Sequence, residues 1–152
     1  MKFNQLILLL CLLFSLKAHA VVTGEMIMIR STEAFPEAMA ILQEAIKKQG
    51  YTLSRVQRVD VGLSAKGYKT DKYRVVFFGK GEEIQQLSSK YPQLTPYLPL
   101  KIAIYAENEN TILISANPAV FNDMFNLPEL KPTFKQWFND VSSILRTVQN
   151  QN

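Results

Sequence analysis

After its first twenty residues this 152-residue chain contains no cysteine and no histidine, because Cys11 and His19 are the only residues of either type. Whatever the remainder folds into must be stable without disulfides and without a zinc site of the usual ligands. Nucleophile systems that depend on a thiol or an imidazole are excluded for it as well. The remaining 132 residues can bury one adequate hydrophobic core. We therefore expect a single domain over residues 21–152, with a frayed tail at residues 149–152.

Residues 1–20 have the pattern of a cleaved secretory signal peptide. Lys2 gives a short basic start, residues 6–16 form a nearly unbroken apolar run, and Ala18 and Ala20 supply the small side chains that signal peptidase needs. The apolar run is well short of the roughly twenty residues that span a bilayer. We expect cleavage after Ala20, export across the inner membrane of a Gram-negative cell, and a periplasmic or secreted protein.

Charge and composition point to no particular partner. Lys2 and Lys17 are two of the 17 basic residues, so 15 basic and 13 acidic residues follow residue 20, a net charge of +2. The cations are scattered along the sequence and form no concentrated basic stripe, so we expect no nucleic-acid partner. We also expect no metal, no cofactor, and no stable membrane span after signal cleavage.

Alternating and helical periodicities predict the order β-α-β-β-α-β-β-α. Two amphipathic helices are expected, one with Phe35 and Ile46 on its apolar face and ended near Gly50, the other running from Phe134 to Val148. A shorter helix follows Gly81. A glycine-containing hairpin connection is expected at 62–71, a stiff extended connection at 91–99, and short helical structure near 121–125. Strands are predicted at 26–30, 53–61, 73–79, 100–106 and 111–116.

This order, with residues 73–79, residues 98–105 and Asn117-Pro118, resembles the domain-of-unknown-function family 302 over nearly all of the chain after residue 20. The resemblance implies an α+β fold similar to that of the TATA-binding protein, a curved antiparallel sheet with helices packed on one face. It also implies a homodimer. The family has no established activity, and some members carry a cysteine near the strand ends that this chain lacks. Function must therefore be argued from a site.

Strand alternation gives the predicted sheet two chemically different faces. Lys101 and Tyr105 should share the face away from the helices, and we take Arg74, Lys101, Tyr105 and Asn117 as candidates for contact with a ligand or partner. The alternative, which we favour for the cations, is that Arg74 and Lys101 are solvated or paired with Asp60 or Glu107.

Two apolar groups admit both a structural and a functional interpretation. Phe121, Phe125 and Trp137 belong to an aromatic cluster that could line an apolar pocket, although core packing is the favoured interpretation. Met26 and Met28 alternate on a strand and could offer thioethers to copper(I), but without a third ligand core packing is again favoured.

Three classes of function follow. The favoured one is a non-catalytic, homodimeric binding module for a small amphipathic or anionic ligand. The alternative is a protein interaction domain that uses the open sheet face. The third is an enzyme with tyrosine, lysine or carboxylate chemistry at Tyr73 or Lys101, ranked last because no titratable groups converge in the sequence.

Overall fold

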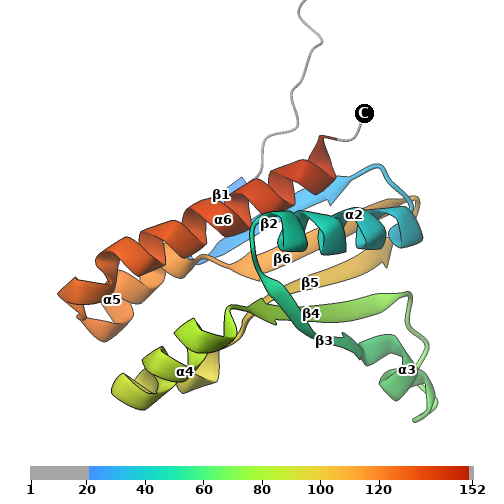
Figure 1. Cartoon of the computed structure of the whole chain (residues 1–152). Coiled ribbons are helices and arrows are strands. Elements are labelled where there is room, and N and C mark those ends of the chain that lie inside the picture. The colour runs from blue at the N-terminus through green and yellow to red at the C-terminus, as the bar shows by residue number, and fades with distance from the viewer. Residues whose placement is uncertain (1–20, 151–152) are drawn as a thin grey trace, which may run out of the picture.

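The computed structural model describes residues 21–150 (Figure 1). Residues 1–20, on which the predicted signal peptide falls, and residues 151–152 lie outside the described part. The fold is α+β, as predicted, with one antiparallel sheet in the order β1-β2-β6-β5-β4-β3. The strands are β1 (Val21–Thr23), β2 (Met26–Ser31), β3 (Thr52–Arg58), β4 (Tyr73–Gly79), β5 (Leu100–Glu107) and β6 (Asn110–Ala116). The α-helices are α2 (Phe35–Lys48), α3 (Val59–Ser64), α4 (Gly81–Lys90), α5 (Phe121–Phe125) and α6 (Lys131–Gln149). Short 3-10 helices are η1 (Pro92–Tyr97), η2 (Pro118–Val120) and η3 (Pro128–Leu130).

Helices α2 and α6 pack against each other and cover one face of the sheet (Figure 1). Their apolar faces are the predicted ones, with buried residues recurring at three- and four-residue steps. In α2 the buried residues are Phe35, Ala38, Leu42, Ala45 and Ile46. In α6 the buried apolar residues are Phe134, Trp137, Val141, Ile144, Leu145 and Val148. From the sheet this core receives alternate residues, among them Ile27, Ile29, Val76, Phe78, Ile102, Ile104 and Leu113.

Helix α2 ends where the sequence predicts, at a left-handed glycine. Gly50 has φ 79°, its amide donates to the Lys47 carbonyl over 2.9 Å, and the Tyr51 amide donates to the Ile46 carbonyl over 3.2 Å. These two bonds form a Schellman motif, which satisfies the last carbonyls of the helix. The chain then enters β3, and Tyr51 is carried into the core beside Phe78, with ring centroids 5.4 Å apart.

The structure departs from the prediction in four short segments. The edge strand β1 was not expected. Helix α3 occupies part of the predicted strand and hairpin connection, and η1 replaces the extended connection because its helical turns bury Leu94. Amides in the first turn of a helix have no intrahelical acceptor, so proline, which lacks an amide hydrogen, is tolerated there. Pro92 at the start of η1 is therefore compatible with the helical turns. Helix α6 continues through Gln149, the first residue of the predicted tail.

Candidate binding surface on the open sheet face

The sheet face opposite α2 and α6 is apolar over its centre. Cross-strand register puts Met28 beside Ile114, Ile114 beside Ala103, and Ala103 beside Val75. On an ordinary solvent-facing sheet surface, these positions hold polar residues. We call this surface the open face. It carries Met26, Met28, Tyr73, Val75, Phe77, Lys101, Ala103, Tyr105, Ile112 and Ile114.

The two methionines correct a sequence interpretation. Met26 and Met28 were assigned to the core, but their side chains are 42 % and 40 % exposed, and Ile27 and Ile29 point into the core instead. Alternation along β2 was predicted correctly, but the side that the helices cover decides which set is buried. The thioethers therefore belong to the open face.

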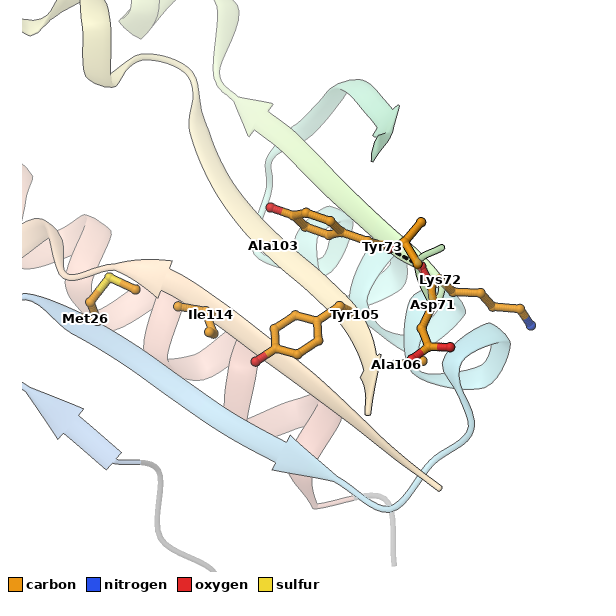
Figure 2. A pocket seen from close by; sticks show the side chains of 9 residues that line it. Met26, Asp71, Lys72, Tyr73, Ala103, Tyr105, Ala106 and Ile114 are labelled. Carbon is orange, nitrogen blue, oxygen red and sulfur yellow. Dashed lines mark hydrogen bonds between the residues drawn. The ribbon is translucent and has the colours of Figure 1, made fainter. Parts of the chain in front are cut away.

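A broad concavity of about 570 Å³ hollows this face. In Figure 2 the side chains of Met26, Ile114 and Tyr105 lie along its length, with Tyr73 on the neighbouring strand. Residues 70–72, which precede β4, close one end. The lining is Met26, Thr70, Asp71, Lys72, Tyr73, Ala103, Tyr105, Ala106 and Ile114. Its volume falls within the range of small-molecule sites, although it is a shallow hollow and not an enclosed cavity.

Tyr73 and Tyr105 are the aromatic pair of the concavity. They are register partners on β4 and β5, and their rings meet edge to face with centroids 6.3 Å apart. Such cross-strand aromatic pairs stabilise a sheet and fix both rings. Tyr105 was predicted at this face. Tyr73 was considered only as a catalytic residue, although the same alternation that selects Val75 and Phe77 selects it too.

Charged side chains stand at the borders of the open face. Arg30 and Glu107 form an ion pair of 2.5 Å at one end, and both are substantially exposed. Lys101 is exposed and is the register partner of Phe77. The predicted placement of Lys101 on this face is therefore correct, while Glu107 is paired with Arg30 and not with Lys101.

Arg74 does not lie on the open face, which corrects its assignment as a ligand contact. Its register partner on β5 is Ile104, a core residue, so the side chain points to the helix side. There its guanidinium donates to Asp60 and lies 5.8 Å from the ring centroid of Phe35. This hydrogen bond is the main reason that the pKa of Asp60 is lowered. Pairing with Asp60 was the structural alternative for this residue, and it is the one observed.

Asn117 is also unavailable to a ligand. Its side chain is buried, with the residue 6 % exposed, and its Nδ2 donates to the Gly24 carbonyl over 3.0 Å. Its Oδ1 accepts the Ala119 amide over 3.0 Å. The residue therefore ties the β1–β2 turn to the end of β6 and caps η2, a role for which asparagine is well suited.

The aromatic cluster fills the core. Phe121 and Trp137 are buried, and Phe125 is partly buried and packs against the core. The Phe121 ring lies 5.6 Å from that of Phe134 and 5.8 Å from that of Phe125, with tilted, edge-to-face geometry. This is the packing interpretation of the sequence, and these three residues do not line the concavity described above.

Residues 21–150 contain neither a cluster of metal ligands nor a membrane-spanning helix. No three histidine, cysteine, aspartate or glutamate side chains in this part of the chain gather as metal ligands would. None of the helices described there is both long and apolar enough to cross a bilayer.

The fold thus defines an α+β domain with one helix-covered and one open, apolar sheet face. Residues 27–148 match the family model described as domain of unknown function DUF302, so the chain belongs to this family. Its structure is similar to the crystal structure of an uncharacterized conserved protein DUF302 from Bacillus stearothermophilus. The TM-score is 0.73 at 19 % identity, with 81 % of this chain and 97 % of that chain covered. Likeness at this identity establishes the fold alone. Comparison with curated proteins gave no match.

Proposed function

We propose that this chain is an exported, non-catalytic binding module that holds a small amphipathic ligand in the concavity of its open face. The observation that carries the proposal is an uncovered sheet surface whose centre is apolar and hollowed. Contiguous exposed apolar surface in a folded domain marks an interaction site. Export rests on the pattern of residues 1–20. The homodimer and the likeness to the TATA-binding-protein sheet rest on the family resemblance.

The lining suggests the chemistry of the ligand. Ala103 is small and leaves room for a flat apolar body between Ile114 and the two tyrosines. Tyrosine hydroxyls can both donate and accept hydrogen bonds. Lys72 lies at the end of the concavity closed by residues 70–72, but its ammonium is 5.8 Å from the centroid of the Phe35 ring and points away from the hollow (Figure 2), so the polar contacts offered to a ligand are the tyrosine hydroxyls. We infer an aromatic or alicyclic ligand with one hydrogen-bonding group.

Binding without catalysis is favoured by the groups that are present. The ionisable side chains of the concavity are Asp71, Lys72, Tyr73 and Tyr105. The chain contains no histidine or cysteine after residue 20 to serve as a base or nucleophile near neutral pH.

The proposal is tested with 1-anilinonaphthalene-8-sulfonate, which combines fused aromatic rings with one sulfonate. We expect the folded protein to enhance its fluorescence saturably. Ala103→Glu puts a carboxylate on the apolar floor between Val75 and Ile114. It should lower the affinity for the dye at least about tenfold.

Ala40→Glu is the matched control, because Ala40 is exposed on α2, on the other side of the sheet. It should leave dye binding unchanged. Equal affinities for the wild type and both variants would place the dye elsewhere and contradict the proposal. Circular dichroism of each variant confirms that it is folded.

A second candidate function is docking of a protein, including a second copy of this chain, on the same face. The observation that favours it is the row Met28, Ile114, Ala103 and Val75, which crosses four neighbouring strands and extends beyond a small ligand. Tyr105→Asp and Lys101→Glu should then shift the sedimentation profile toward smaller species. An unchanged profile in both variants would argue against docking between copies.

A further inference from the structure

Residues 58–72 run from the last residue of β3 to the residue before β4. They contain α3 and the loop that follows, and they lead away from β3, which is an edge strand of the sheet. In Figure 1 α3 lies at the lower right, where β3 ends, below α2 and α6. The ion pair from Asp60 to Arg74 holds its start to β4. We call residues 58–72 the basic arm.

Large apolar side chains of the basic arm are exposed to solvent. Val61 is 46 % exposed and Tyr68 is 63 % exposed, the highest value among the large hydrophobic residues of the described chain. None of the residues of α3 is buried. Singly exposed apolar side chains are common on folded proteins, so Tyr68 and Val61 bear on an interface only together with the charges beside them in the sequence.

Cations accompany these apolar side chains. Arg58, Lys66, Lys69 and Lys72 are all exposed. The three ion pairs within residues 21–150 join other cations to their carboxylates, so these four are not neutralised by a salt bridge there. Of the two acidic residues of the arm, Asp60 is engaged by Arg74. Asp71 is exposed as well, so the four cations exceed the acidic charge that remains on the arm, and they lie within fifteen residues of one another in the sequence.

We infer that the basic arm binds the surface of a membrane that contains anionic phospholipid. Lysine and arginine near such a surface each strengthen attachment, by about fivefold per residue. Tyrosine favours the headgroup region, where its ring is buried and its hydroxyl remains wet. A purely polar polyanion would match the cations but would leave Tyr68 and Val61 without a partner. The combination therefore favours lipid over nucleic acid.

The test is flotation of the protein with vesicles, at low ionic strength, of phosphatidylcholine alone or with about one third phosphatidylglycerol. Residues 21–150 contain the whole sheet and core, so the chain from residue 21 is used, which also removes the apolar run at 6–16. We expect binding to the anionic vesicles only, and weaker binding as salt shortens the range of the electrostatic attraction.

Two double variants distinguish an effect of the basic arm from an effect of the net charge of the protein. Lys66→Glu with Lys69→Glu should reduce partitioning at least about 25-fold, from two cations at about fivefold each. Lys131→Glu with Lys135→Glu makes the same charge change at exposed positions of α6. This double variant should change partitioning to the vesicles less than about threefold. Tyr68→Ser should weaken binding at unchanged charge.

Several outcomes would overturn the inference. Equal losses in the two double variants would mean that net charge alone acts. Binding to phosphatidylcholine at equal strength would exclude recognition of charge. Binding to a single-stranded oligonucleotide but not to vesicles would identify a different class of partner.

Discussion

At the scale of single residues, a buried carboxylate joins the two core helices. Asp140 on α6 is buried, and its Oδ2 accepts a hydrogen bond from the Tyr51 hydroxyl over 2.7 Å. Its Oδ1 accepts from Gln136 over 2.8 Å. Tyr51 lies just after the end of α2, so this bond fixes α6 against the α2–β3 junction. A buried polar group is stable only while its hydrogen bonds are made.

Tyr51→Phe should therefore destabilise the fold. Removing the hydroxyl leaves Asp140 Oδ2 without its donor, which costs about 1–3 kcal/mol. Tyr91→Phe is the control, because the Tyr91 hydroxyl donates over 3.0 Å to Glu129, an exposed carboxylate, and its loss should cost less than about 1 kcal/mol. Urea unfolding measures both. Equal losses of unfolding free energy in the two variants would show that the hydrogen bond to Asp140 contributes no more than an exposed one.

The same tyrosine makes stability depend on alkaline pH. Burial, and then the hydrogen bond and negative charge of Asp140, raise the pKa of Tyr51 above its usual value near 10. The unfolded chain loses this proton at a lower pH than the folded protein. The stabilisation is therefore complete below about pH 10 and declines as the pH rises further.

We predict that the free energy of unfolding falls more steeply in the wild type than in Tyr51→Phe as the pH rises beyond about 10. The control is Tyr68→Phe at an exposed position, which should retain the wild-type slope. Urea titrations at several pH values measure the slopes. Parallel curves for the wild type and Tyr51→Phe would contradict the assignment.

Residue identities predicted the covered face of β5 but not that of β2 or β4. Met26 and Met28 were expected in the core because they are apolar and alternate. The error at Arg74 came from the assumption that every residue on the helix side is apolar. Arg74 is tolerated there because Asp60 supplies a carboxylate and Phe35 an aromatic ring. Asp60 is one of the two partners that sequence analysis proposed, whereas the contact with Phe35 required the structure.

At the scale of elements, helix α3 depends on one ion pair. Asp60 and Arg74 have side chains that are each 15 % exposed, and they link the first turn of α3 to β4. The helix has six residues and no buried face, so its own propensity is insufficient to hold it.

Asp60→Asn should loosen this connection and cost about 1 kcal/mol. Amides of residues 59–68 should exchange faster with deuterium while those of α6 do not change. Asp71→Asn, at an exposed carboxylate of the same connection, is the control. The pKa of Asp60 is lowered in the folded protein. The stabilisation by the Asp60–Arg74 pair is therefore complete above the ordinary aspartate pKa, near 4, and is lost as the pH falls below it. Exchange that is unaltered in Asp60→Asn would contradict this role.

Long elements were predictable because their periodicity is repeated over several turns or residues. The apolar faces of α2 and α6 and the strands β4, β5 and β6 follow from sequence alone. Short elements were not. The pattern of α3 resembles a hairpin connection because Gly62 and nearby polar residues dominate it, and the three residues of β1 are stabilised by pairing with β2. Such segments are set by tertiary contacts that no local pattern records.

At the scale of the whole molecule, the two sheet faces divide structure from proposed function. One face is sealed by α2 and α6, which bury the aromatic cluster that sequence reasoning had considered as a pocket. The other is apolar, hollowed and open. The candidate residues Lys101 and Tyr105 belong to it. Alternation along β4 also indicates Tyr73, whereas Met26 and Ile114 complete the face from positions that strand register identifies. The location of the site thus required the sheet order.

Native mass spectrometry of the protein recovered from the producing cells tests the central claim most directly. If the open face is a binding surface, the wild type and Ala40→Glu should carry a retained small molecule or a second copy, and Ala103→Glu should carry neither. The mass of the subunit also reports whether cleavage follows Ala20. A bare monomer for all three proteins, or the same occupant in all three, would contradict the claim that the open face binds.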